Sequence, residues 1–135
     1  MTQPVQTTVR RLQAGDEDVV RALAEHEPQT ALLADDRTIF LVAFHGDEPV
    51  GFAFGYELPR RHGAPTILFV YELGVDEAYR RQGIATRLLT ELQRAAPAAA
   101  SFVLTETDND AANTLYESLG GERSEAVMWD FPSAD

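Results

Sequence analysis

The stretch that decides the fold, residues 72–86, reads ELGVDEAYRRQGIAT. An apolar run that begins at Thr66 ends in it, a short loop with two arginines follows, and a periodic apolar segment begins at Gly83. This order predicts a strand, a basic loop and a helix. Free backbone N–H groups and the positive end of the helix dipole then meet at one point. The stretch therefore predicts an anion site that suits a phosphate or pyrophosphate.

Four residues define this expected anion site. Gly83 lets the backbone approach an anion closely, and Ala85 leaves the first helical turn unobstructed. Arg80 and Arg81 can add positive charge. The same residues are also compatible with an ordinary strand-to-helix turn whose arginines are solvated, so the pattern alone leaves both interpretations open.

The flanking residues predict a strand–helix–strand unit. Leucines recur at helical spacing from Gly83 to about Ala96, where Pro97 ends the helix. Residues 101–107 predict a second strand. Because a helix joins it to the strand at residues 66–75, the two strands should lie parallel, with a right-handed crossover.

The N-terminal half predicts a short strand, helical segments and a hairpin. In chain order we expect a strand at 8–12, a helix from Asp16 to about His26, a helical segment at 29–33, and strands at 38–45 and 50–56. Residues 46–48 read as the turn of an antiparallel hairpin. Gly51, Ala53 and Gly55 leave one face of its second strand open to a helix or a ligand.

The C-terminal third predicts a helix and a last strand. The helix starts at Asp108 or Asn109 and ends at Gly120, with Tyr116 on its apolar stripe. Residues 127–131 predict the final strand. Since we find no repeat and no linker, residues 1–135 are expected to form one domain with an α+β sandwich fold.

The composition excludes several classes of function. The 135 residues include 22 acidic and 11 basic side chains, which gives a net charge of -11. Such a balance argues against nucleic acid as a partner and favours a cationic one. The absence of cysteine excludes disulfides and thiol chemistry, and the three histidines show no ligand spacing, so no metal is expected.

The remaining polar and apolar patterns carry expectations about location and surface. No signal-peptide core and no run of 18 apolar residues is present, so we expect a soluble cytoplasmic protein without a membrane partner. The acidic pairs at residues 35–36 and 47–48 are expected to be solvated turns.

Two motifs carry a resemblance to a known family. Residues 80–85, RRQGIA, resemble the Gln/Arg-x-x-Gly-x-Gly/Ala motif of the GNAT acetyltransferase superfamily. Residues 109–120, NDAANTLYESLG, resemble its Asn-x-x-Ala…Tyr-x-x-x-Gly helix. The expected element order fits as well, so the resemblance covers nearly the whole chain. It implies an acetyl-CoA-dependent N-acetyltransferase with a mixed, mostly antiparallel sheet, in which a central parallel strand pair is flanked by helices.

Further segments resemble the small aminoglycoside 3-N-acetyltransferases of that superfamily. They cover residues 56–59, 70–75, 80–86 and 125–131. The sequence departs from that pattern at Glu72 and Glu106, where we expect Asp, and at Asn109, which replaces an acidic residue. The resemblance implies the 3-amino group of an aminoglycoside as the acceptor, and with it a role in antibiotic resistance.

The resemblance also implies which residues bind acetyl-CoA, the expected cosubstrate. Its pyrophosphate would lie on the backbone amides of the loop and helix start, and its pantetheine would pair with the strand end. Asn109 would contact the pantetheine, a role compatible with capping its helix. The expected residues are Leu73, Gly74, Val75, Arg80, Arg81, Gln82, Gly83, Ile84, Ala85, Thr86 and Asn109.

Three residues are candidates for catalysis. Glu72 interrupts an apolar strand, and side-chain alternation along that strand places it on the face opposite Phe69 and Tyr71. Glu106 is the last residue on one face of the next expected strand. Either carboxylate can accept an ammonium proton or bind a polycation, and either could instead be an exposed or salt-bridged glutamate. The resemblance implies that Tyr116 protonates the departing thiolate, although its spacing alone also fits a core position.

The sequence alone leaves alternative functions open. A polyamine or a protein N-terminus could replace the aminoglycoside as the cationic acceptor, and a CoA-binding regulatory module would need the anion site alone. A homodimer is one assembly that the resemblance allows.

Overall fold

A computed structural model describes residues 6–24, 27–63, 65–96 and 100–133 of the chain. The chain divides into two compact units, residues 1–104 and residues 105–135. The expectation of a single domain over residues 1–135 stays a prediction.

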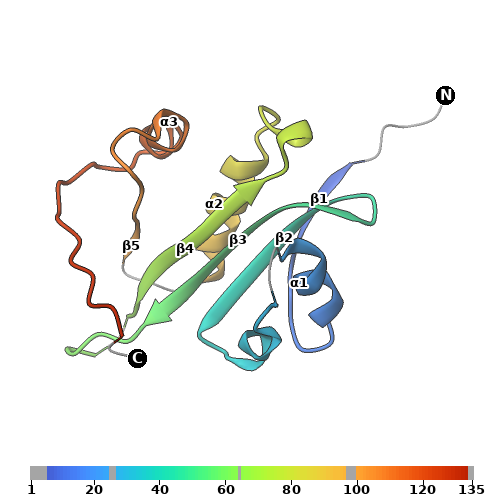
Figure 1. Ribbon diagram of the computed structural model, residues 1–135, viewed down its shortest axis with the longest axis horizontal. Coiled ribbons are helices and arrows are strands. Elements are labelled where there is room, and N and C mark those ends of the chain that lie inside the picture. The colour runs from blue at the N-terminus through green and yellow to red at the C-terminus, as the bar shows by residue number, and fades with distance from the viewer. Residues whose placement is uncertain (1–5, 25–26, 64, 97–99, 134–135) are drawn as a thin grey trace. The chain divides into compact units, whose positions relative to one another are not determined.

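The first unit is built on one five-stranded sheet in the order β1-β2-β3-β4-β5 (Figure 1). Neighbouring strands are antiparallel except for the parallel pair β4–β5. The expected mixed, mostly antiparallel sheet is therefore confirmed. The elements are β1 (Thr7–Arg11), α1 (Glu17–Leu23), η1 (Thr30–Ala34), β2 (Thr38–His45), β3 (Glu48–Leu58), β4 (Ile67–Val75), η2 (Glu77–Tyr79), α2 (Ile84–Ala95) and β5 (Ala100–Val103).

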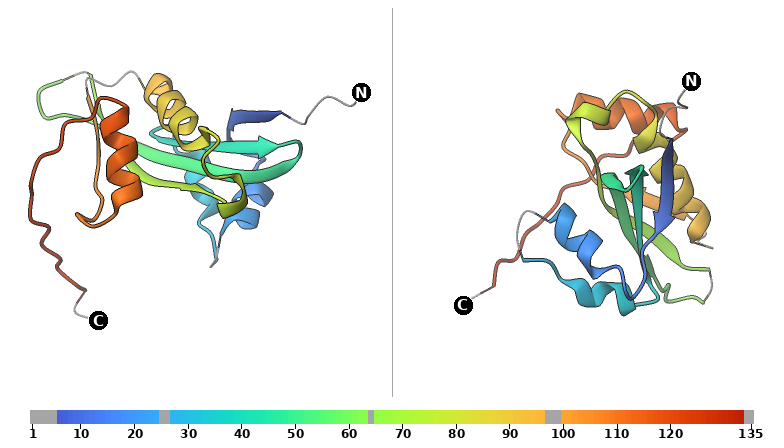
Figure 2. Two further views of the ribbon diagram at one scale, coloured as in Figure 1. Left: turned by 90° about the horizontal axis from the view of Figure 1, so that it is seen from above. Right: turned by 90° about the vertical axis from the view of Figure 1, so that its right-hand side faces the viewer.

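Helices cover both faces of this sheet (Figure 2). On one face α2 packs against β2, β3 and β4 and buries Ile84, Leu88, Leu89 and Leu92. The small residues of β3 make room for it, because a Cβ on Gly51 would lie 3.4 Å from Cδ1 of Leu88. On the other face α1 and η1 cover a core cluster of Leu12, Val20, Phe40, Val42, Phe44 and Phe54.

Several element ends differ from the sequence expectation. Helix α1 ends at Leu23, and His26, the expected end, lies outside the described residues, as does Pro97. Asp16 precedes α1 without capping it through its side chain. Its carboxylate instead accepts a hydrogen bond from the backbone N–H of Gln13 at 2.9 Å. Strand β5 ends at Val103, well short of residue 107, because its pairing with β4 stops there.

The second unit consists of helix α3 (Asp110–Ser118) and an extended C-terminal segment. The predicted strand at residues 127–131 is wrong, since residues 121–133 contain no strand. Its apolar side chains Val127, Met128, Trp129 and Phe131 are between 69% and 89% exposed. A strand needs a hydrogen-bonding partner for its backbone, and none is present for this segment among the described residues. The parallel pair β4–β5 consequently lies at one end of the described sheet and not at its centre.

Candidate functional site

A β-bulge at Tyr71 shapes the middle of β4. Gly55 of β3 pairs with Val70, and Phe54 pairs with Glu72, so Tyr71 has no partner on β3. The extra residue changes the alternation of side chains along the strand. Gly55 suits this position, because a Cβ there would come within 2.6 Å of the Phe69 carbonyl oxygen.

The bulge brings Glu72 and Tyr71 to the same face of the sheet. Glu72 lies opposite Phe54, whose side chain belongs to the core cluster under α1 and η1. The Tyr71 ring lies 5.3 Å from the Phe54 ring and 5.7 Å from the Phe69 ring, measured between centroids. The prediction that strict alternation places Glu72 opposite Phe69 and Tyr71 is wrong. Side-chain alternation cannot reveal a bulge, which depends on the pairing of two strands.

The loop between β4 and α2 leaves the start of α2 open. Gly83 precedes the helix with φ +79° and supplies no side-chain cap, and the first helical bond runs from the Arg87 N–H to its carbonyl at 3.0 Å. The N–H groups of Ile84, Ala85 and Thr86 therefore have no partner within the helix. Apart from its two neighbours in the chain, no residue comes within 4 Å of a Cβ built on Gly83. The free N–H groups and the open position at Gly83 are compatible with a phosphate, and the predicted helix start is confirmed.

The two arginines of the loop differ in their surroundings. Arg80 donates a hydrogen bond from Nε to the carbonyl oxygen of Val75 at 3.1 Å, so it braces the end of β4 against the loop. Arg81 has a left-handed backbone, φ +66°, and an exposed side chain. That conformation costs a non-glycine residue about 1–2 kcal/mol. Arg81 is thus the arginine that can turn toward an anion without giving up a bond to the strand.

The end of β4 offers a free strand edge. Pairing with β5 runs from Ile67 to Val70 and then stops, while β4 continues to Val75. Among the strands of residues 6–104, Leu73, Gly74 and Val75 thus pair with β3 alone. An extended ligand can pair with such an edge. The structure brings this edge and the open start of α2 onto one strand–loop–helix segment.

Acidic and phenolic groups gather on the face that carries Glu72. Burial raises the pKa of Tyr56, and the neighbouring Tyr71, Glu72 and Asp35 raise the pKa further. Tyr56 pairs with Thr38, whose N–H bonds to the Asp35 carbonyl oxygen at 3.0 Å. The expectation that Asp35 is a solvated turn residue is confirmed, since it is exposed and its Oδ1 accepts a hydrogen bond from the Arg37 N–H at 2.9 Å. The Tyr56 phenol stays neutral near pH 7.

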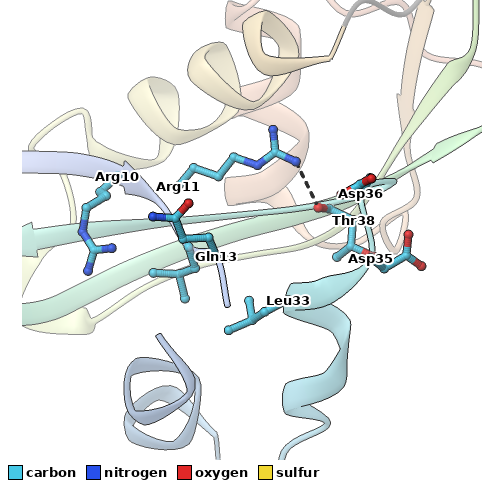
Figure 3. Close-up of a pocket in the computed structure, with 8 residues that line it drawn as sticks. Arg10, Arg11, Gln13, Leu33, Asp35, Asp36 and Thr38 are labelled. Atoms are coloured by element: carbon cyan, nitrogen blue, oxygen red, sulfur yellow. Dashed lines mark hydrogen bonds between the residues drawn. The ribbon is translucent and has the colours of Figure 1, made fainter. Parts of the chain in front are cut away.

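A cavity of about 540 Å³ adjoins Asp35, between the end of β1, η1 and the start of β2 (Figure 3). Its arginines are already engaged. Arg10 pairs with Asp16 at 3.1 Å, and Arg11 donates to the Thr38 carbonyl oxygen at 3.3 Å. The lining residues are Arg10, Arg11, Leu12, Gln13, Leu33, Asp35, Asp36 and Thr38.

The second unit holds the other three expected site residues. Asn109 caps α3, since its Oδ1 accepts a hydrogen bond from the Ala112 N–H at 3.1 Å. Glu106 lies in the turn before α3, not in a strand as expected, and its carbonyl oxygen accepts from the Asn109 N–H at 3.1 Å. The Glu106 side chain is exposed. Burial raises the pKa of Tyr116, so its phenol is protonated at neutral pH.

Tyr56, Tyr71 and Asp35 are the residues near Glu72 that the sequence expectations did not include. A usable signal existed for Tyr56, because Phe54 and Tyr56 recur at a period of two on a strand whose neighbour carries Phe69. No such signal existed for Tyr71, whose direction depends on the bulge.

Two kinds of feature are absent from the described parts of the chain. No group of three or more His, Asp or Glu side chains that could hold a metal ion occurs in these segments. None of their helices is both long enough and apolar enough to cross a membrane.

The sequence matches known acetyltransferases. The chain is 38% identical over 91 residues to N-alpha-acetyltransferase RimI of Mycobacterium tuberculosis, an alignment that covers 67% of this chain and 56% of RimI. It is 39% identical over 93 residues to the L-2,4-diaminobutyric acid acetyltransferase of Methylotuvimicrobium alcaliphilum, covering 63% of this chain and 52% of that protein. The chain thus spans about half the length of these curated relatives.

The fold matches a solved structure over nearly its whole length. The crystal structure of an aminoglycoside acetyltransferase, HMB0005, from an uncultured soil metagenomic sample superposes with a TM-score of 0.86. It is 30% identical in sequence, and the match covers 96% of this chain and 99% of that one. A sequence model of the acetyltransferase (GNAT) family matches residues 7–121. The chain therefore belongs to the acetyltransferase (GNAT) family.

Proposed function

We propose that this protein transfers an acetyl group from acetyl-CoA to a primary amine of a cationic small molecule, foremost the 3-amino group of an aminoglycoside. The observation that carries the proposal is the union of an open helix N-terminus and a free strand edge on one segment, residues 73–86. An anion and an extended chain can be held there side by side, which is the combination that a pyrophosphate joined to pantetheine requires.

Acetyl-CoA would be held by three parts of the chain. The N–H groups of Ile84, Ala85 and Thr86 would bind the pyrophosphate, with Gln82 and Arg81 beside it. The free edge at Leu73, Gly74 and Val75 would pair with the pantetheine amides. Asn109 of the second unit is proposed as a further pantetheine contact. When bound, acetyl-CoA supplies a thioester whose carbonyl carbon is open to attack by an amine.

The other candidate residues would transfer protons and stabilise charge during the reaction. Glu72 takes the proton of the acceptor ammonium, directly or through a water, so that the amine nitrogen can attack. The C–N bond forms as the C–S bond breaks, and a backbone N–H near Val75 stabilises the charge on the carbonyl oxygen. Tyr116, whose pKa is raised by burial, would give its proton to the departing sulfur, and the second proton of the attacking nitrogen would return to the phenolate through water as the amide forms. Glu106 is the alternative base.

The charge of the molecule supports a cationic acceptor. The chain carries a net charge of -11, and Glu72 and Asp35 act together on the Tyr56 phenol. Acidic surroundings draw a polycation toward the site and hold it there. The similarity to HMB0005, described as an aminoglycoside acetyltransferase, supports an aminoglycoside as that polycation.

A second candidate acceptor is the α-amine of a peptide or protein. The 38% identity to RimI, named as an N-alpha-acetyltransferase, favours it. A narrow acceptor channel for one chain end would suit this candidate, whereas several carboxylates around an open face suit a polycation with several rings.

A thiol-release assay with acetyl-CoA tests the proposal. The panel would contain sisomicin, spermidine, L-2,4-diaminobutyrate and a peptide with an N-terminal alanine. We expect acceptor-dependent release of CoA with sisomicin at the highest kcat/KM. Turnover with the peptide alone would favour the second candidate, and acetyl-CoA binding without turnover on any amine would contradict an enzyme.

A further inference from the structure

Three aromatic side chains form a continuous surface beside Glu72. We name Tyr56, Phe69 and Tyr71 the aromatic wall. The ring of Tyr71 lies 5.6 Å from that of Tyr56 and 5.7 Å from that of Phe69, with interplanar angles of 74° and 83°. Both tyrosines also contact the buried Phe54, at 5.6 Å and 5.3 Å. The wall is thus fixed to the core on one side, so its rings are held in place before any ligand arrives.

The wall is open on its other side. Helix α1 and η1 cover the part of this face that Phe40 and Val42 occupy, whereas the Tyr71 side chain remains 53% exposed. Tyr71 faces this way because of the bulge in β4. An aromatic ring on a rigid strand, exposed and braced from behind, is suited to contact with a ligand.

Two carboxylates flank the wall. Glu72 follows Tyr71 directly and shares its face. Asp35 lies in the turn before β2, where its carbonyl oxygen accepts a hydrogen bond from the N–H of Thr38, the residue that pairs with Tyr56. Burial raises the pKa of the Tyr56 phenol, and the charges of Glu72 and Asp35 raise it further. Neither takes part in any of the ion pairs found among the described residues, which are Arg10–Asp16, Arg21–Asp18 and Arg87–Glu91. Oδ1 of Asp35 accepts a hydrogen bond from the Arg37 backbone N–H at 2.9 Å, and neither carboxylate is neutralised by one of these ion pairs.

Aromatic faces and carboxylates together recognise one kind of group. A ring attracts an ammonium ion through its quadrupole, and it also packs against C–H groups of a sugar or an alkyl chain. A carboxylate adds a charge-assisted hydrogen bond to the same ammonium. Two carboxylates around one wall suit a molecule with at least two ammonium groups.

We propose that the aromatic wall, Glu72 and Asp35 form the acceptor subsite, which selects polycationic amines that present an apolar or sugar-ring face. The inference rests on the proposed function and specifies its acceptor. Glu72 holds the reacting ammonium, Asp35 holds a second one, and Tyr71 packs against the carbon skeleton between them. Tyr71 and Asp35 are thus specificity-determining residues, separate from those that bind acetyl-CoA.

The test is calorimetric titration of sisomicin into the whole chain, without acetyl-CoA. Tyr71→Leu removes the ring and keeps an apolar side chain, and Tyr71→Phe removes the hydroxyl alone. We expect Tyr71→Leu to raise the Kd of sisomicin about fivefold, because leucine lacks the flat aromatic face that packs on the carbon skeleton and attracts the neighbouring ammonium groups. Tyr71→Phe keeps that face and should bind like the parent. Asp35→Asn should also weaken sisomicin, and the Kd of acetyl-CoA should stay constant in every variant.

The outcomes separate this inference from the function on which it rests. Equal sisomicin affinity in the parent, Tyr71→Leu and Asp35→Asn would overturn the subsite even if the chain acetylates amines. A parent chain that does not bind sisomicin at all would overturn the subsite as well. A third outcome is that Tyr71→Leu and Asp35→Asn both weaken sisomicin binding while the parent chain releases no CoA. That outcome would support the subsite and contradict the transferase. Unchanged acetyl-CoA affinity shows that each variant is folded.

Discussion

The residues around Glu72 determine what its carboxylate can do. It stands on an open sheet face beside the rings of Phe54 and Tyr71, and its charge reaches the Tyr56 phenol together with that of Asp35. A carboxylate in this setting can hold an ammonium group and accept its proton. Arg80, by contrast, donates to the Val75 carbonyl, and neither Arg80 nor Arg81 takes part in the ion pairs found among the described residues.

Replacing Glu72 tests its role as the base. We expect Glu72→Gln to lower kcat about 100-fold, because the amide keeps the shape but cannot take a proton, while the Kd of acetyl-CoA is unchanged. Steady-state kinetics and acetyl-CoA titration measure the two quantities.

The matched control is Glu91→Gln. Glu91 pairs with Arg87 on the surface of α2, and the loss of such a pair has little effect. A Glu72→Gln variant with normal kinetics would remove Glu72 as the base. A comparable loss in Glu106→Gln alone would assign the role to Glu106.

At the scale of elements, helix α2 contributes both to the stability of the fold and to the proposed anion site. Its apolar stripe is buried against β2, β3 and β4, so truncation of Leu88 or Leu92 would cost about 2–5 kcal/mol of folding free energy. That packing fixes the direction in which the free N–H groups of its first turn point. The strand–loop–helix segment therefore holds the proposed anion cradle in a fixed direction.

A substitution at the start of α2 tests the cradle. We expect Gly83→Asp to abolish acetyl-CoA binding, since a carboxylate would occupy the space that the phosphates need and would repel them. The measurement is calorimetric titration of acetyl-CoA. The matched control is Gly15→Asp, because Gly15 also has a positive φ, +110°, and open space around its Cβ position. An acetyl-CoA affinity in Gly83→Asp equal to that of the control would show that the anion site is misplaced.

Elements whose causes are local could be predicted from the sequence. The hairpin turn at Gly46, the apolar stripe of α2 and the cap of α3 at Asn109 each depend on residues within a few positions of one another. The bulge at Tyr71 depends on the pairing of β3 with β4, and the strand expected at residues 127–131 depends on a partner edge. These features require contacts between segments distant in sequence, which composition and periodicity do not contain.

At the scale of the whole molecule, the net charge of -11 is unevenly distributed. The loop before α2 carries two arginines, one of them free to turn toward an anion, whereas Glu72 lies on the open face of the sheet and Asp35 in the turn before β2. An anionic cosubstrate and a cationic acceptor would thus meet different parts of one unit. The sequence predicted a cationic partner from the total charge, but only the bulge and the pairing of Thr38 with Tyr56 show where that charge gathers.

The central claim is that this protein joins the acetyl group of acetyl-CoA to an amine of a polycation. Its most direct test is product analysis, by mass spectrometry and NMR, after incubation of the chain with acetyl-CoA and sisomicin. We predict sisomicin with one acetyl group on its 3-amino nitrogen, in an amount equal to the CoA released. Sisomicin recovered unmodified, with acetyl-CoA intact, would contradict the claim.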